Sequence, residues 1–206
     1  MANRTSHQEN LQIAIASAIA ILAIGLVLGS VLVHEVDVAV AQTNFIPLIP
    51  TTLSTTSIGA PVQLLIPSLN VKADIEQVGL TKAGSMDVPT DPMNVGWYAT
   101  GPHPGAVGSA VMDGHVNWWG GKTGVFKRLH LLEPGAKIMV ADETGAIITF
   151  VVSHVKSYDA AANATDIFTS QDGLAHLNLI TCSGAWNTAE QQYNDRLVIF
   201  ADKINN

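Results

Sequence analysis

The chain has 206 residues, 48% of them hydrophobic, which suffices for one domain with a real core and leaves little room for a second. Ten Lys and Arg stand against 17 Asp and Glu, so the formal net charge of −7 argues against nucleic-acid-binding proteins, which need a basic stripe. A single cysteine rules out an intramolecular disulfide within the chain.

The first predicted element is an apolar segment over residues 11–33, which contains no charged side chain. At about 1.5 Å per residue a helix of this length spans about 35 Å, enough to cross a hydrocarbon core of about 30 Å. A cleavable signal peptide is the alternative, because Ala39 and Ala41 form a small-x-small pattern, but the apolar run exceeds the usual length of about 7 to 15 residues. A buried globular helix is rarely this long. We therefore expect an uncleaved transmembrane anchor.

Charges on the two sides of this segment set its expected orientation. Arg4, the terminal amine and Glu9 precede the segment, whereas Glu35 and Asp37 follow it. The positive-inside rule then places residues 1–10 in the cytoplasm and the remaining chain outside. The sequence predicts a single-pass protein of the cell membrane with an extracytoplasmic domain.

Residues 34–59 are rich in Thr, Ser, Pro and small apolar residues and show no period, which predicts a flexible tether. The folded domain should therefore cover residues 60–206. Short alternating segments separated by Gly, Pro, Asp and Asn clusters predict strands there. The expected strands are 62–66, 73–79, 109–114, 136–142, 146–158, 176–182 and 196–202. Residues 124–132 favour one or two helical turns, and the whole indicates a mainly β closed barrel or sandwich.

Cys182 ends the predicted strand 176–182 and precedes an expected turn at Gly184. Asn178 shares its face of the strand, and Thr181 points the other way. A lone cysteine is most often a small buried hydrophobe, and it can also pair with a second molecule. A strand end and an extracytoplasmic location instead suit a nucleophile, which needs access and a nearby His or Arg. The residues around Cys182 leave all three interpretations open.

Candidate partners for the thiol lie at other strand ends. His115 stands between Gly114 and two tryptophans, and Arg196 opens the last predicted strand, which could neighbour the strand of Cys182. The alternative to a catalytic role is that His115 is a surface loop histidine and Arg196 a solvated arginine at a strand edge. His176 lies about 20 Å from Cys182 along its strand, too far to act as its base, and His154 suits a strand residue without a catalytic role. No close ligand spacing joins Cys182 to the histidines, so no metal site is expected.

These stretches together resemble the sortases, which are membrane-tethered cysteine transpeptidases of the bacterial surface. The resemblance rests on a TLxTC-like strand end, a Gly-His pair at another strand end and an arginine that opens the last strand. The matching segments are 61–71, 95–105, 114–135, 177–184 and 196–201. The segments VGWY, GPHPG and GHV followed by GVFKRL are most similar to classes E and F, especially class F.

The resemblance implies an eight-stranded barrel in which Cys182 is the nucleophile, His115 the general acid and base, and Arg196 the group that orients substrate and stabilises the oxyanion. Histidine titrates near neutral pH and suits proton transfer to a leaving amine, and a guanidinium offers donors to the tetrahedral oxygen. The implied substrates are secreted proteins with a C-terminal LPxTG-like sorting motif, transferred through a thioester to an amine of the cell envelope. No cofactor is implied.

Two residues depart from the family pattern. Asp113 stands where a small apolar residue is usual, on the expected face of His115, and we expect it to favour the charged imidazolium. Asn117 replaces a common acidic residue. Two other functions stay open: a cysteine peptidase on the same barrel, in which water resolves the thioester, and a non-catalytic, membrane-anchored binding barrel. Calcium dependence also stays open, although no dense carboxylate cluster is present.

Overall fold

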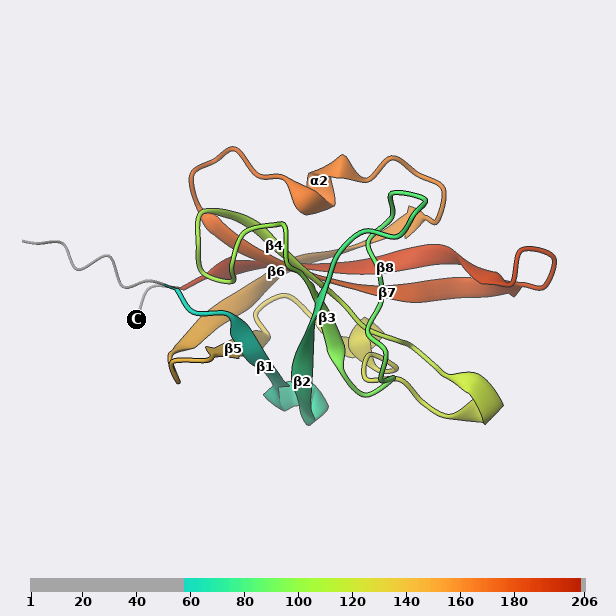
Figure 1. The fold of residues 1–206 in the computed structure, drawn as a ribbon, viewed down its shortest axis with the longest axis horizontal. Helices are drawn as coiled ribbons and strands as arrows, with labels where there is room; N and C mark the ends of the chain where they lie inside the picture. The colour runs from blue at the N-terminus through green and yellow to red at the C-terminus, as the bar shows by residue number, and fades with distance from the viewer. Residues whose placement is uncertain (1–57, 205–206) are drawn as a thin grey trace, which may run out of the picture. The chain divides into compact units, whose positions relative to one another are not determined.

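The computed structural model describes residues 58–204, and within them eight strands close into one barrel (Figure 1). The order around the barrel is β1-β2-β3-β4-β7-β8-β6-β5. The strands are β1 (Pro61–Ile66), β2 (Val71–Val78), β3 (Val95–Tyr98), β4 (Gly108–Asp113), β5 (Lys137–Asp142), β6 (Ile147–Asp159), β7 (Ala175–Asn187) and β8 (Gln192–Lys203). The expected mainly β, closed eight-stranded barrel is confirmed.

Helical structure in the described residues is confined to short turns. These are η1 (Pro67–Leu69), η2 (Trp119–Gly121), η3 (Leu129–Leu131) and α2 (Thr165–Phe168). The turn expected within residues 124–132 is therefore confirmed by η3. No helix of residues 58–204 is both long and apolar enough to cross a membrane. The expected anchor at 11–33 and nearly all of the expected tether at 34–59 lie outside the described residues.

The barrel interior is filled by the inward side chains of alternating strands. On β7, Leu177 and Leu179 are fully buried, and on β8 Ile199 is fully buried as well. This is the period-2 pattern that predicted the strands. A second, smaller apolar cluster lies where α2 packs against the barrel, and it contains Val111, Tyr158, Ile167 and Val198. The short helix α2 thus covers one outer face of the sheet.

The hairpin of β7 and β8 is longer than the sequence pattern predicted. Cys182 pairs with Arg196 as expected, but the ladder continues to the pair of Asn187 and Gln192 (Figure 1). The prediction that Cys182 ends its strand is therefore wrong, and Gly184, with φ of 78°, lies in a bulge between Ser183 and Trp186. The apolar alternation stops at Cys182 because the barrel interior ends there. Beyond this point the two strands still pair through their backbones, although neither faces the hydrophobic core.

Strand β3 was not predicted from the sequence. It has only four residues, includes Gly96, and pairs in parallel with β2. A short buried strand has no polar alternate positions, so periodicity cannot identify it. Its buried Val95 and Trp97 complete the wall between β2 and β4. The site described next lies along this part of the barrel.

Candidate active site

Cys182 and Arg196 face each other across the β7–β8 ladder. The Arg196 guanidinium donates hydrogen bonds from Nη1 to the carbonyls of Tyr193 at 2.9 Å and Asp195 at 3.0 Å. The thiol of Cys182 is free and half-buried. Burial raises the pKa of this thiol, the charge of Arg196 opposes that rise, and Asp113 adds to it. The resting sulfur is therefore a protonated thiol beside a fixed cation.

His115 reaches the same place from β4. The parallel pairing of β4 with β7 sets Asp113 opposite Ile180, so the chain after β4 continues alongside Cys182. The Nε2 atom of His115 lies 3.1 Å from the carbonyl oxygen of Pro89. A carbonyl only accepts hydrogen bonds, so Nε2 carries the hydrogen and Nδ1 is the proton-accepting atom of the neutral ring.

Two glycines allow the backbone of His115 to pack closely. A Cβ at Gly114 would lie 2.6 Å from the ring of Phe126, and a Cβ at Gly124 would collide with the His115 carbonyl group. The Thr181 hydroxyl donates to the Gly114 carbonyl at 2.7 Å, which ties β7 to this loop. Gly114 therefore permits the close approach of the Phe126 and Val125 side chains, and the histidine backbone is held from both sides.

The Pro89 carbonyl is itself held in place by Glu76 of β2. The Glu76 carboxylate accepts hydrogen bonds from the Thr90 N–H and hydroxyl at 2.9 Å each, the Asp91 N–H at 3.2 Å and the Asn94 amide at 2.9 Å. These bonds, led by the Thr90 N–H, lower the pKa of Glu76 to about 2, against a smaller opposing effect of burial. Glu76 therefore anchors the segment whose carbonyl orients His115. Nothing in the strand pattern distinguished it.

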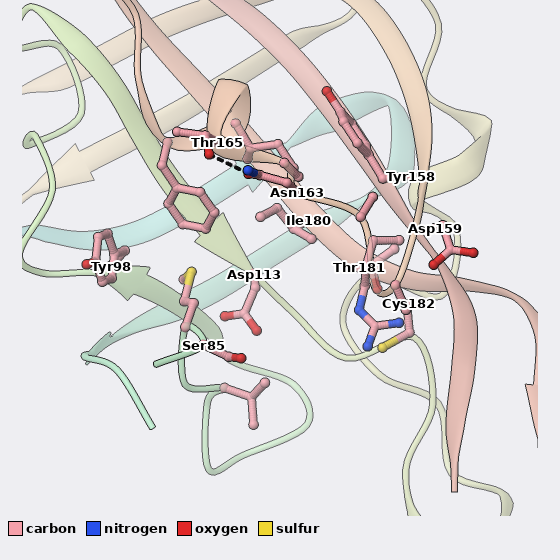
Figure 2. A pocket seen from close by; sticks show the side chains of 18 of the residues that line it. Ser85, Tyr98, Asp113, Tyr158, Asp159, Asn163, Thr165, Ile180, Thr181 and Cys182 are labelled. Carbon is pink, nitrogen blue, oxygen red and sulfur yellow. Dashed lines mark hydrogen bonds between the residues drawn. The ribbon is translucent and has the colours of Figure 1, made fainter. Parts of the chain in front are cut away.

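Two cavities of about 620 Å³ each meet at Cys182 and His115. The first, here called the Asp113 pocket, also includes Thr181 and Arg196. In Figure 2 Asp113 lies between Ser85 on one side and Asn163 and Thr165 on the other, and Cys182 lies to the right of them. The second, here called the tryptophan pocket, lies on the side of the β7–β8 hairpin and includes Trp118, Trp119 and Trp186.

Asp113 is in a different state from the one predicted. Its Oδ1 atom is buried and has no hydrogen-bond partner among the described residues, and burial is the main cause that raises the pKa of its carboxyl to about 8. The carboxyl is therefore mostly neutral at pH 7. A neutral acid cannot stabilise an imidazolium, so the expectation that Asp113 favours charged His115 is wrong. The sequence placed Asp113 correctly near the site and could not show that it lacks partners.

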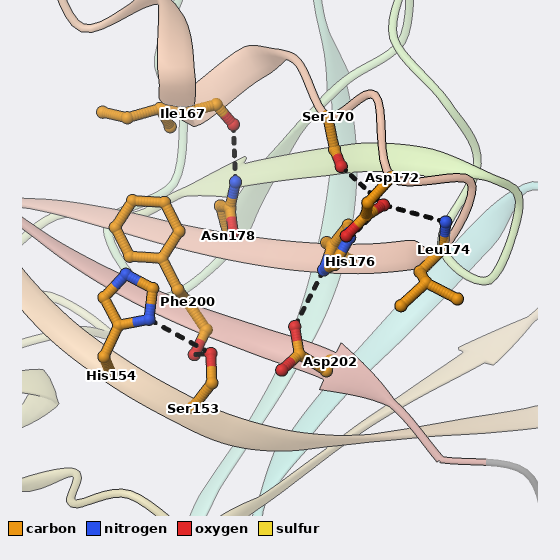
Figure 3. Close-up of polar contacts among 10 residues, drawn as sticks. All are labelled: Ser153, His154, Ile167, Ser170, Asp172, Leu174, His176, Asn178, Phe200 and Asp202. Carbon is orange, nitrogen blue, oxygen red and sulfur yellow. Dashed lines mark hydrogen bonds and ion pairs between the residues drawn. The ribbon is translucent and has the colours of Figure 1, made fainter.

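Other predicted positions lie outside the two cavities. Asn178, predicted to share the face of Cys182 on this strand, is buried beneath α2 and donates to the Ile167 carbonyl at 2.5 Å (Figure 3). His176 binds Asp172 and Asp202 near the start of β7 (Figure 3). It precedes Cys182 by six residues along the strand, as expected. His154 stacks on Phe200 with ring centroids 4.4 Å apart. The polar face expected along β7 is thus covered by α2.

Asn117, the second departure from the family pattern, links the two walls of the tryptophan pocket. Its side-chain amide donates to the Tyr193 hydroxyl at 2.7 Å, which joins the loop after β4 to the β7–β8 hairpin.

Residues 58–204 contain no group of three His, Cys, Asp or Glu side chains arranged to hold a metal ion. The chemistry available at the site is that of a thiol, an imidazole and a guanidinium.

A model of the sortase domain matches residues 64–204. Among solved structures, a lid mutant of sortase A from Corynebacterium diphtheriae is similar, with a TM-score of 0.56, 17% identity, and 71% of each chain covered. Sortase C-1 from Actinomyces oris has a TM-score of 0.56 and 21% identity over 71% of this chain and 76% of its own. The Clostridium perfringens sortase D5 transpeptidase has a TM-score of 0.54 and 18% identity over 71% and 79%. No curated protein sequence gives a significant match.

Proposed function

The chain belongs to the sortase family, and from this premise we propose that it is a cysteine transpeptidase of the class F type. It cleaves a C-terminal LPxTG-like sorting motif in secreted proteins and transfers the acyl fragment to an amine of the cell envelope. The observation that carries the proposal is the meeting of two cavities at one thiol and one imidazole, Cys182 and His115. A transpeptidase needs an acyl side and an amine side at the same nucleophile.

In the first half of the reaction the Cys182 sulfur attacks the scissile carbonyl carbon while His115 takes the thiol proton. A raised thiol pKa suits this order, because the proton leaves only when the imidazole is in place. His115 then protonates the leaving amine, the C–N bond breaks and a thioester remains on sulfur. The acyl segment occupies the Asp113 pocket.

Arg196 is the proposed oxyanion group. A guanidinium has five N–H donors, and the carbonyls of Tyr193 and Asp195 engage those of Nη1 only. The strand register sets Arg196 opposite Cys182, and both residues line the Asp113 pocket, so we expect the remaining donors to serve the thioester carbonyl there. A preorganised donor of this kind stabilises the charge that develops on the tetrahedral oxygen.

The test is incubation of the full-length protein with a panel of LPxTG-like peptides, with and without triglycine, followed by mass spectrometry. We expect an acyl adduct on Cys182 and a ligated product that appears only with triglycine. Cys182→Ala should abolish the adduct, and Arg196→Lys should reduce it strongly because the planar donor set is lost. Hydrolysis without ligation would favour the cysteine peptidase, and absence of any adduct would favour the binding barrel.

We also propose that residues 11–33 anchor the protein in the cell membrane, with residues 1–10 inside and the domain at 60–206 outside. Cys182 is the only cysteine of the chain, so a charged, membrane-impermeant thiol reagent reports its location directly. Labelling of Cys182 on intact cells is the expected result. Labelling that requires lysis would contradict this orientation.

A further inference from the structure

The tryptophan pocket has an aromatic lining that includes, among the described residues, no Lys, Arg, Asp or Glu side chain. Four aromatic side chains from two separate segments line it: Trp118, Trp119, Trp186 and Tyr193. Asn and Gln side chains and small residues make up the remainder around Cys182 and His115, and the described lining includes no Lys, Arg, Asp or Glu. Arg196, in contrast, lines the Asp113 pocket.

The aromatic walls are connected to the reacting groups and to each other. The Trp118 ring meets the His115 ring edge-on with centroids 4.7 Å apart, and the Trp186 ring meets Tyr193 in the same way at 5.2 Å. The hydrogen bond from Asn117 to the Tyr193 hydroxyl joins the two walls. The pocket is therefore a built structure continuous with His115.

Two of these rings are unusually open to solvent. Trp119 is 81% exposed and Trp186 is 49% exposed. Large exposed aromatic side chains gathered in one place mark binding surfaces, because their area is otherwise buried in a soluble domain. Their position beside Cys182 indicates a ligand that takes part in the reaction.

The lining selects the chemistry of that ligand. A primary amine is an ammonium ion at neutral pH, and aromatic faces attract such a cation through their quadrupole. Arginine or lysine side chains in the lining would repel it. We infer that the tryptophan pocket binds the ammonium group of the acceptor substrate and delivers it to the thioester. This inference rests on the proposed transpeptidase function.

The second half of the reaction balances with the groups present. His115 is neutral after protonating the first leaving amine, so it removes one proton from the bound ammonium and passes that proton to solvent. The freed amine attacks the thioester carbon, and His115 takes a second proton from the attacking nitrogen as the C–N bond forms and the C–S bond breaks. The sulfur then takes a proton back from His115, which restores the thiol and the neutral imidazole.

The first experiment measures the ratio of ligated to hydrolysed peptide with the full-length protein and triglycine. The peptide ends at the glycine of the sorting motif, with its C-terminus as an amide. The leaving group is then this single amidated glycine, which reaches little of the tryptophan pocket. Trp186→Ala and Trp119→Ala should each lower this ratio by about fivefold to tenfold, and Trp186→Phe should retain most of it because a ring face is kept. Leu131→Ala, an exposed apolar residue outside both pockets, should leave it unchanged.

A second experiment needs no catalysis. Choline and its uncharged isostere 3,3-dimethylbutanol are titrated separately, and the indole N–H resonances are followed by NMR. Choline should shift the resonances of the pocket tryptophans and compete with triglycine, while the isostere should do neither. Equal shifts with both compounds, or an unchanged ligation ratio in the tryptophan variants while the thioester forms, would overturn the inference. Absence of a thioester in the wild-type protein would instead overturn the proposed function, and the choline titration would still test the pocket.

Discussion

Two carboxylates lie in one row across the barrel and are in opposite states. Glu76 of β2 pairs with Gly96 of β3, which pairs with Asp113 of β4. Glu76 accepts four hydrogen bonds and its pKa falls to about 2. Asp113 has a buried oxygen that finds no partner within residues 58–204, and its pKa rises to about 8. The hydrogen-bond donors available to a carboxyl, more than its position in the sheet, therefore decide whether it is charged.

The largest expected effect comes from the residue between them. A Cβ at Gly96 would lie 2.5 Å from Oδ1 of Asp113 and 3.1 Å from the Val78 side chain. Gly96→Ala should therefore destabilise the protein by about 2 to 3 kcal/mol, measured by urea unfolding. The double variant that combines Gly96→Ala with Asp113→Ala should regain much of the lost stability, because the clashing carboxyl is removed. Gly79→Ala is the matched control, because a Cβ there meets nothing within 4 Å.

Asp113→Asn should give the next largest change in the free energy of unfolding, and this change should be an increase. The pKa of Asp113 is raised in the folded state, so its contribution to stability is fully present below about pH 4 and is lost as pH rises through about 8. The variant should match wild type near pH 4 and exceed its free energy of unfolding by roughly 2 kcal/mol at pH 9. Asp74→Asn, at an exposed position on β2, should show no such trend. A constant difference across this range would contradict burial as the cause.

Glu76→Gln should change the free energy of unfolding with the opposite dependence on pH. The pKa of Glu76 is lowered from 4.5 to about 2, so its contribution is present above about pH 4.5 and is lost as pH falls toward 2. We expect a loss of about 1 kcal/mol at pH 7, discounted for partial exposure, that shrinks by pH 3. The variant should also change the ¹⁵N shifts of the His115 ring, since Pro89 loses its anchor. Glu133→Gln, an exposed control, should change neither quantity.

The smallest effect is expected at His176, near the other end of β7. Burial lowers the pKa of His176, but the hydrogen bonds and charges of Asp172 and Asp202 outweigh it, so the pKa is raised overall. The stabilisation is present below about pH 6.5 and is lost as pH rises through the folded pKa. His176→Gln should cost about 0.5 kcal/mol at pH 5 and little at pH 9, by thermal unfolding. A loss that grows with pH would contradict the ion pairs.

Strand positions and candidate site residues were predictable because both depend on local patterns. Alternation placed seven of the eight strands within a few residues, since a strand that closes a barrel must bury every second side chain. Family-like segments singled out Cys182, His115 and Arg196, and the structure brings the three side chains around two adjoining cavities. Strand β3 was missed because a short, fully buried strand lacks alternation.

What depends on long-range contacts could not be predicted. The role of Glu76 depends on a segment that begins 14 residues later in the chain. The neutral state of Asp113 depends on burial and on an Oδ1 atom that has no partner in the part of the chain that the structure describes. The tryptophan pocket likewise needs the loop after β4 and the β7–β8 hairpin to meet. No local sequence pattern predicts contacts between segments that are so far apart in the chain.

The sequence by itself determined the alternation that builds the barrel and the residue types that can perform thiol chemistry. Only the tertiary structure decided which atoms are charged, which carbonyl orients His115 and which side of Cys182 is aromatic. The physical reason is that alternation acts between neighbouring residues, whereas burial and hydrogen bonding depend on groups that meet only when the barrel closes.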